Sequence, residues 1–349
     1  MEILQPNIRF EISAASRVLP ESEPITNVEI LRNFPRTADR TPAFIEKFAE
    51  KIGEEFGFHQ RYWCHKPWEP VDASRELTAE SLAIRCVKKL LASYTPETIQ
   101  AYLLGSTTNK RFTGSQAAAV LGEIGLNAPA YDLKTGCSTS LSTLHLAYAL
   151  MALGYKNVLL TCAETLSKVI DPENEKTWIG LADGAATLFL EKKATGSFTV
   201  EKSFFSTDGH YVDAYTTRGV FPPTQQQMET VGYHLIGDET LLKELAYSRY
   251  TQMLQHLFSS EEDKKAITWV IAHQVNRKLI EQLLDENQLT HTTIIWDADK
   301  IGNIGGASII YTLARAVEEH IFDRPGKILL MSVGGGLSYA AQVLQYHKA

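Results

Sequence analysis

Cysteine is scarce in this chain, with four residues among 349. No two of them have the CxxC spacing of a zinc site, and four is too few for a disulfide framework, so we expect reduced thiols and no bound metal. Cys162 in VLLTCAE and Cys86 in SLAIRCVKKLL lie in apolar patterns, where a thiol packs as a small hydrophobe. Cys64 stands beside His65, but neighbours on a regular element point apart. Cys137 is therefore the cysteine that needs a chemical explanation.

Long apolar runs and positive charge are also lacking. No run approaches the roughly 20 residues of a membrane-spanning helix, and the opening MEILQPNIRFE has no charged-then-apolar signal-peptide pattern. The 34 Lys and Arg residues are outnumbered by 41 Asp and Glu residues, which gives a net charge of −7. This balance argues against nucleic-acid binding, although a local basic patch can still receive an acidic carrier protein. We expect a cytoplasmic protein that engages neither membranes nor nucleic acid.

The chain does contain an alternation of strand-like and helix-like segments, which is typical of the α/β class. Strands are expected at 101–106, 129–134, 157–163, 185–191, 197–206, 267–273, 293–297, 327–333 and 337–345. Helices are expected at 40–56, 114–125, 137–154, 238–258, 275–286 and 303–320. The second half repeats the order of the first, and the polar stretch KKATGS near residue 193 predicts two domains, 1–192 and 193–349. The less periodic segments 16–80 and 207–236 are expected to be capping loops, apart from the helix at 40–56.

Cys137 lies in YDLKTGCSTSLS, where a strand-like run stops at a glycine and an apolar-periodic helix begins. A cysteine in the first turn of a helix faces unpaired N–H groups and the positive end of the macrodipole, which favour the thiolate. We therefore predict a lowered pKa and a nucleophilic role for Cys137. The helix should be anchored by an apolar stripe at Leu141, Leu144, Tyr148 and Met151.

Two further polar residues follow the same construction. His273 closes the apolar run WVIAHQVN, and Asn303 lies between glycines in IGNIGGAS before another helix. Each has a plain structural interpretation, because His273 can be a satisfied histidine at a strand end and Asn303 can cap the following helix. The glycines Gly334–Gly336 can likewise form a bend between strands. The ordered occurrence of all of them with Cys137 favours a shared catalytic site.

Six motifs in this order resemble the β-ketoacyl-ACP synthase III branch of the thiolase-fold superfamily: GCSTS, ADGAATLFL, STDGHY, HQVN, GNIGGAS and VGGGLSYAA. The resemblance covers most of the chain, and it is weak across the first 100 residues and the 212–236 loop. It implies a five-layered α-β-α-β-α architecture made of two similar halves, with Cys137 in the first and His273 and Asn303 in the second. It also implies a homodimer or a heterodimer with a related subunit, and it leaves a branch of specialised metabolism open.

The resemblance further implies the reaction. Cys137 would accept an acyl group from a thioester by nucleophilic attack. His273 and Asn303 would then donate hydrogen bonds to the carbonyl of a malonyl- or β-ketoacyl-type thioester, stabilising the enolate that forms on loss of carbon dioxide. The backbone N–H groups of Cys137 and Gly335 would form the oxyanion hole. The substrates would be acyl-CoA or acyl-carrier-protein thioesters, with no bound cofactor.

The family pattern assigns further residues by position. Phe112 in TTNKRFTGSQ matches the residue that reaches across the dimer into the partner's acyl pocket, and plain interface packing is the alternative. Lys168 and Lys278 fall near basic positions that contact phosphopantetheine of coenzyme A or a carrier protein, unless they are simply solvated lysines. Gly305 and Gly306 replace larger residues of the usual motif and are expected to widen the substrate pocket.

The sequence also departs from the family. Lys51 and Glu55 stand where the tryptophan and arginine that clasp the adenine of coenzyme A belong, and an acidic side chain repels phosphate. We therefore expect an acyl donor other than a typical acetyl-CoA starter, bound to a carrier protein or carrying a longer chain. Two other functions stay open. One is an acyltransferase of the same fold that moves the acyl group from Cys137 to an alcohol or amine without decarboxylation, and the other is a non-catalytic partner subunit.

Overall fold

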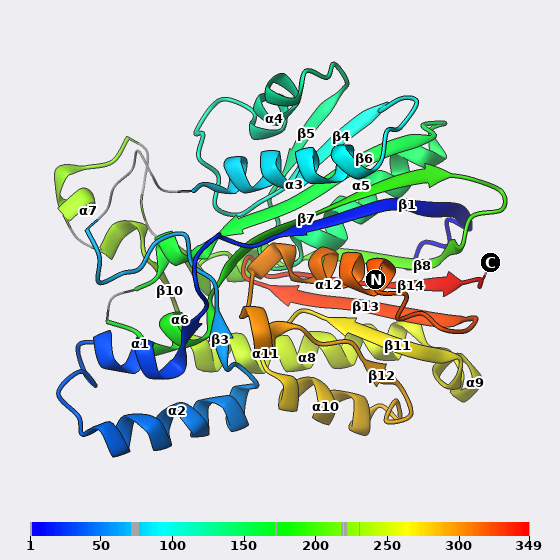
Figure 1. The fold of residues 1–349 in the computed structure, drawn as a ribbon. Coiled ribbons are helices and arrows are strands. Elements are labelled where there is room, and N and C mark those ends of the chain that lie inside the picture. The colour runs from blue at the N-terminus through cyan, green and yellow to red at the C-terminus, as the bar shows by residue number, and fades with distance from the viewer. Residues whose placement is uncertain are drawn as a thin grey trace.

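The computed structural model describes residues 2–70, 77–171, 173–217, 219, 222–229 and 231–348. Its central feature is a ten-stranded mixed sheet with the strand order β12-β11-β13-β14-β8-β1-β7-β6-β4-β5 (Figure 1). The first five strands of this sheet along the chain are β1 (Ile8–Val18), β4 (Ala101–Gly105), β5 (Ala130–Leu133), β6 (Asn157–Thr165) and β7 (Asp183–Lys192). The other five are β8 (Phe198–Thr207), β11 (Ile267–Ala272), β12 (Thr293–Ile294), β13 (Gly326–Gly334) and β14 (Ser338–Tyr346).

The two groups of five strands have the same internal order. From the junction outward, β1-β7-β6-β4-β5 and β8-β14-β13-β11-β12 each contain two antiparallel pairings followed by two parallel ones. The groups are joined by a short antiparallel pairing of β1 with β8 that involves Ile8, Arg9 and Phe10. The repeat that the sequence predicts is therefore present in the strand order.

Helices cover both outer faces and fill the space between the two groups of strands (Figure 1). The inner helices are α5 (Thr139–Ala152) and α12 (Ser308–Glu318), and their apolar side chains share one core with strands of both groups. The outer helices are α3 (Ala79–Ser93) and α4 (Gln116–Ile124) on one side, and α8 (Glu239–Leu257) and α10 (Arg277–Glu286) on the other. This arrangement confirms the five-layered α-β-α-β-α architecture.

The position of α5 explains its composition. Ten of its fourteen residues are buried, because strands pack on both of its faces, and the helix is accordingly apolar around most of its circumference. The predicted stripe of Leu141, Leu144, Tyr148 and Met151 is buried as expected. A helix held this firmly fixes the turn that precedes it, and Cys137 lies in that turn.

The segments expected to be capping loops contain more structure than their sequence indicates. Within 16–80 lie the end of β1, the small sheet of β2 (Ile25–Thr26) and β3 (Gln60–Arg61), α1 (Asn27–Asn33) and the predicted helix, α2 (Pro42–Phe56). Within 207–236 lie β9 (Tyr215–Thr217), α7 (Gln225–Glu229) and most of β10 (Leu235–Gly237), and β9 pairs with β10. The short helices are α6 (Glu175–Gly180), α9 (Glu261–Lys265) and α11 (Ala298–Ile301), with 3-10 turns at Leu166–Val169, Gly209–Tyr211, Val231–Tyr233 and Gly305–Ala307. Residues 71–76 and the positions 218, 220, 221 and 230 of the two segments lie outside the described residues.

One smaller difference concerns a helix. The predicted helix 303–320 begins as α12 only at Ser308, because Gly305–Ala307 form a 3-10 turn first. Across the described ranges, none of the helices has the length and apolarity that crossing a lipid bilayer demands.

Candidate active site

Cys137 lies in a tight turn between β5 and α5, just before the helix begins. The connection between β13 and β14 closes over this turn, so that a Cβ atom on Gly334 would lie 2.4 Å from the Cys137 nitrogen. Gly136 has a φ of +60°, and a Cβ atom there would lie 2.4 Å from the Gly335 carbonyl oxygen. The Ser332 hydroxyl donates to the Cys137 carbonyl at 3.0 Å. Only glycine allows the two backbone segments to come this close. The β13–β14 hairpin of the second half therefore packs directly on the turn that carries Cys137.

The charge state of Cys137 differs from the expectation. Burial raises the pKa of the thiol to about 11, and the nearby Glu164 carboxylate acts in the same direction. The backbone N–H groups of Gly335 and of Cys137 itself act against this, because they are within hydrogen-bonding reach of the sulfur. The helix begins two residues later, at Thr139, so the sulfur does not occupy its first turn. The predicted lowering of the pKa is therefore wrong, because desolvation outweighs the backbone dipoles, and the resting group is a thiol.

His273 follows the last residue of β11, and the sheet brings it toward the cysteine. Its backbone N–H donates to the Met331 carbonyl at 2.9 Å, and β13 continues from Met331 to Ser332 and Gly334, which touch Cys137. The side chain is 1% exposed, and its Nδ1 has no hydrogen-bond partner in the described part of the chain. Burial lowers the pKa of His273 to about 4. The imidazole is therefore neutral near pH 7, with one N–H group to donate.

Asn303 is held between two segments of the chain. Its backbone N–H donates to the Gly180 carbonyl at 2.9 Å, and its carbonyl accepts from the Ala182 N–H at 2.9 Å. Its side-chain Oδ1 accepts from the Gly305 N–H at 2.9 Å and from the Ser308 hydroxyl at 3.4 Å. Because Oδ1 is occupied in this way, Nδ2 is the atom of this side chain that can donate to a ligand. The residue does not cap α12, whose N-cap is Ala307, so the capping interpretation is wrong.

The turn that follows Asn303 packs on the turn that carries Cys137. The Ser140 hydroxyl donates to the Gly306 carbonyl and accepts from the Ile310 N–H. A Cβ atom on Gly306 would lie 3.0 Å from the Gly136 carbonyl oxygen. The backbone segments that carry Cys137, His273 and Asn303 are thus linked by direct contacts, although the three residues are far apart in the sequence.

Glu164, near the end of β6, is a residue of this centre that sequence reasoning missed. Its carboxylate is fully buried and accepts hydrogen bonds from the N–H and hydroxyl groups of both Thr107 and Thr108, at 2.8 to 3.1 Å. Burial nevertheless raises its pKa to about 7, and the four donor groups work against that rise. The available signal was a lone acidic residue closing the apolar run VLLTCAE.

Arg61 is a second residue that was missed, and it supports the segment beside Asn303. Its guanidinium is fully buried and donates to the Ile179 carbonyl at 2.5 Å and to Asn27 Oδ1 at 2.7 Å. Burial lowers the pKa of Arg61 to about 9. Its Cβ atom would lie 2.7 Å from a Cβ atom on Gly302. Burying a cation beside uncharged acceptors lowers the stability of a fold. The presence of Arg61 here therefore indicates a structural role in holding this segment.

The glycines expected to widen the pocket do not do so. A Cβ atom on Gly306 would lie 2.8 Å from both Glu164 Oε1 and Thr139 Cβ. One on Gly305, which has a φ of +52°, would lie 2.7 Å from Leu166 Cδ1. The space that larger residues would fill is therefore occupied by Glu164, Thr139 and Leu166, and the prediction of a wider site is wrong.

The remaining predicted residues lie on the periphery. Phe112, in the loop between β4 and α4, is 74% exposed. Lys168 is partly buried in the 3-10 turn that follows β6, and Lys278 is exposed on α10, five residues after His273. Lys51 and Glu55 are exposed on α2.

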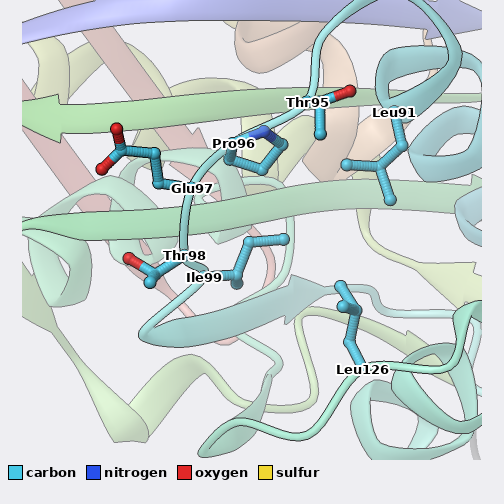
Figure 2. Close-up of a pocket in the computed structure, with 7 residues that line it drawn as sticks. All are labelled: Leu91, Thr95, Pro96, Glu97, Thr98, Ile99 and Leu126. Atoms are coloured by element: carbon cyan, nitrogen blue, oxygen red, sulfur yellow. The ribbon is translucent and has the colours of Figure 1, made fainter.

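No cluster of His, Cys, Asp and Glu suited to a metal ion is found in the described ranges. A hollow of about 280 Å³ lies between the end of α3 and the start of β4, and Figure 2 shows the side chains that line it. They are Leu91, Thr95, Pro96, Glu97, Thr98, Ile99 and Leu126. The residues that line this hollow include none of the candidate site residues.

Comparison with known proteins points to one family of enzymes. Residues 131–209 match the family described as 3-oxoacyl-(acyl-carrier-protein) synthase III, and residues 257–346 match the C-terminal part of the same family. The β-ketoacyl-(acyl-carrier-protein) synthase III of Bartonella tribocorum is 25% identical over 318 residues, covering 88% of this chain and 94% of the relative. The enzyme of the same name from Caldanaerobacter subterraneus is 28% identical over 292 residues, covering 80% and 85%.

A solved structure gives the same result for the fold. The 3-oxoacyl-(acyl carrier protein) synthase III of Pseudomonas aeruginosa superposes with a TM-score of 0.81 at 21% identity, covering 97% of this chain and 99% of that one. These relatives favour condensation over the acyltransferase and non-catalytic alternatives. Together the family models, the named relatives and the shared fold support a β-ketoacyl-ACP synthase III-like condensing enzyme with the thiolase fold.

Proposed function

We propose that this condensing enzyme loads an acyl group on Cys137 and joins it to a malonyl- or β-ketoacyl-type thioester with loss of carbon dioxide. The observation that carries the proposal is the seating of the β13–β14 hairpin on the cysteine turn, with the Gly335 N–H within reach of the sulfur. An N–H group there is suited to hold the oxyanion of a tetrahedral intermediate, together with the N–H of Cys137.

The first half-reaction is transfer of the acyl group to sulfur. The Cys137 thiol must lose its proton as it attacks, because its raised pKa keeps it protonated at rest. The acyl carbon forms a bond to sulfur, and the bond to the leaving thiol breaks. The departing thiolate of coenzyme A or of a carrier protein takes up one proton, which balances the step.

In the second half-reaction the neutral imidazole of His273 and Nδ2 of Asn303 donate to the thioester carbonyl of the extender. The C–C bond to the carboxylate breaks, carbon dioxide leaves, and the electron pair remains as an enolate that these two donors stabilise. The enolate carbon then attacks the acyl group, and the bond from the acyl carbon to sulfur breaks as the product forms. Sulfur leaves as a thiolate and takes up one proton from solvent, which restores the resting thiol. A histidine with a pKa of about 4 suits this role, because it stays neutral and does not transfer its proton to the enolate.

We further propose acyl-CoA or acyl-carrier-protein thioesters as substrates and a dimer of identical or related subunits. The exposed aromatic ring of Phe112 supports a contact with a second subunit, and Lys168 and Lys278 are proposed to meet the phosphopantetheine arm. Glu55 on α2 supports a donor other than acetyl-CoA, within a branch of specialised metabolism. The two repeated groups of strands support a division into residues 1–192 and 193–349.

The test separates the two half-reactions. His273→Ala is expected to gain the mass of the acyl group on Cys137, measured by intact-protein mass spectrometry, and to release no carbon dioxide from the extender. Cys137→Ser should gain no mass at all under the same conditions. Loss of acylation in a folded His273→Ala protein would contradict this division of labour. The proposal on the donor fails if acetyl-CoA and acyl-carrier proteins acylate Cys137 at comparable rates.

A further inference from the structure

Gln274, the residue after His273, is buried, and both polar ends of its side-chain amide make hydrogen bonds. The residue is 1% exposed. Its Oε1 accepts from the backbone N–H groups of Asp297 and Ala298 at 3.0 and 2.7 Å, and its Nε2 donates to the Thr312 hydroxyl at 2.6 Å. Such short bonds inside a core hold the partners firmly, because burial strengthens a hydrogen bond and keeps bulk solvent from competing for it.

These partners lie on both sides of Asn303 in the sequence. Asp297 and Ala298 begin α11, which ends at Ile301, two residues before Asn303. Thr312 lies in α12, which starts five residues after Asn303. The side chain of Gln274, which follows His273 directly, therefore binds the chain both before and after Asn303.

The need for this link is visible in α11. A helix of four residues does not hold itself together, and its first N–H groups need acceptors. The N-cap residue Asp297 makes no side-chain capping bond, and its carboxylate instead lies 2.5 Å from the Arg315 guanidinium. Gln274 Oε1 supplies the missing acceptor, so the start of α11 is set by the histidine turn.

We propose that Gln274 is a positioning residue that sets the separation between the His273 imidazole and the Asn303 carboxamide. The proposal rests on the function proposed above, in which both groups donate to one thioester oxygen. Two donors can share one oxygen only if their spacing is held within a fraction of an ångström, and a misplacement of about 1 Å costs on the order of 100-fold in rate. Acylation of Cys137 does not use this pair of donors and is not sensitive to their spacing.

The experiment compares the half-reactions in variants that break the link. Gln274→Met removes all three hydrogen bonds at similar volume and is expected to slow carbon dioxide release by roughly 10- to 100-fold, while acylation of Cys137 changes less than about twofold. Thr312→Val removes only the hydroxyl and should act in the same direction with a smaller effect, and Thr312→Ser should restore the rate. Thr161→Val is the matched control, because it breaks the buried 2.9 Å hydroxyl contact of Thr161 with Thr187 between β6 and β7.

The outcomes are distinct. An unchanged rate of carbon dioxide release in Gln274→Met overturns the proposal, and so does an equal loss of both half-reactions, which is the mark of a purely structural role. If Gln274→Met does not fold, the difference between Thr312→Val and Thr312→Ser decides the question. His273→Ala is measured alongside. If it keeps decarboxylation, the proposed function fails, whereas if it loses decarboxylation and Gln274→Met does not, only the positioning role fails.

Discussion

The protonation state of Cys137 gives the sharpest prediction, because the local sequence and the folded structure point in opposite directions. With a pKa of about 11, about one thiol in a thousand is ionised at pH 8, whereas an ordinary cysteine with a pKa of about 8.5 is about one-quarter ionised. A thiolate of higher pKa is intrinsically more nucleophilic, which offsets roughly tenfold of this difference. We therefore expect Cys137 to react with iodoacetamide roughly 20-fold more slowly than a free thiol at pH 8.

The shape of the pH profile is more decisive than the rate at one pH. Alkylation of Cys137 should still rise about tenfold per pH unit up to pH 10, because ionisation is far from complete there. Peptide mapping separates Cys137 from Cys64, which is also partly exposed, while Cys86 and Cys162 are buried. Cys137→Ser is the blank. A plateau below about pH 8 would refute the reasoning, because it would mean that the backbone dipoles outweigh burial and Glu164.

The contribution of Glu164 can be isolated with one substitution. Glu164→Gln removes the carboxylate that disfavours the thiolate, so the rising part of the profile should move to lower pH. Glu191→Gln is the matched control, because Glu191 lies on β7 opposite Asn157, at the other end of the β6–β7 pair from Glu164. An identical profile in wild type and Glu164→Gln would show that the carboxylate does not act on the sulfur.

Two further predictions concern stability. Glu164 has a folded-state pKa raised to about 7, so it contributes stability that is present below about pH 4.5 and is lost as the pH rises to 7, by about 3 kcal/mol. In urea unfolding, the free energy of unfolding of Glu164→Gln should therefore increase relative to that of wild type as the pH rises from 4.5 to 7. A difference between the two proteins that does not change with pH would contradict this. Gly306→Ala should lower the free energy of unfolding by about 1–3 kcal/mol, because its Cβ atom would meet Glu164 and Thr139 at 2.8 Å. Gly122→Ala in α4, whose Cβ atom would meet nothing within 4 Å, should instead raise the free energy of unfolding by about 0.5–1 kcal/mol, measured by the same urea unfolding.

Much of the layered fold could be predicted from the sequence, because its elements carry strong local signals. The apolar stripe of α5 and the continuous apolar run of β6 define buried elements without further information. β1 was not predicted, because polar residues such as Ser16 interrupt its pattern. In the folded chain the Ser16 hydroxyl donates to the Cys86 carbonyl at 2.8 Å, a partner 70 residues away. Local periodicity contains no information about such a partner.

In the candidate site, too, local sequence predicts some residues and gives no sign of others. Cys137, His273 and Asn303 could be proposed because each follows the end of a strand or a glycine turn and lies in a motif that resembles the family. The role of Gly305 and Gly306 could not be predicted, because the space beside them is filled by Glu164, Thr139 and Leu166 from distant segments. Arg61 and Gln274 were missed for a similar reason, since they have hydrogen-bond partners 118 and 38 residues away in the sequence.

Burial also explains why the site as a whole carries little charge at rest. It raises the pKa of Cys137 and of Glu164 and lowers the pKa of His273, so all three shifts favour the neutral form. In the proposed reaction the negative charge arrives with the extender and moves to its thioester oxygen. A hydrogen bond to that oxygen is stronger in such surroundings than in water, because few mobile dipoles are present to screen it. The burial that disfavours a resting thiolate is thus the same property that strengthens the two donors on which decarboxylation depends.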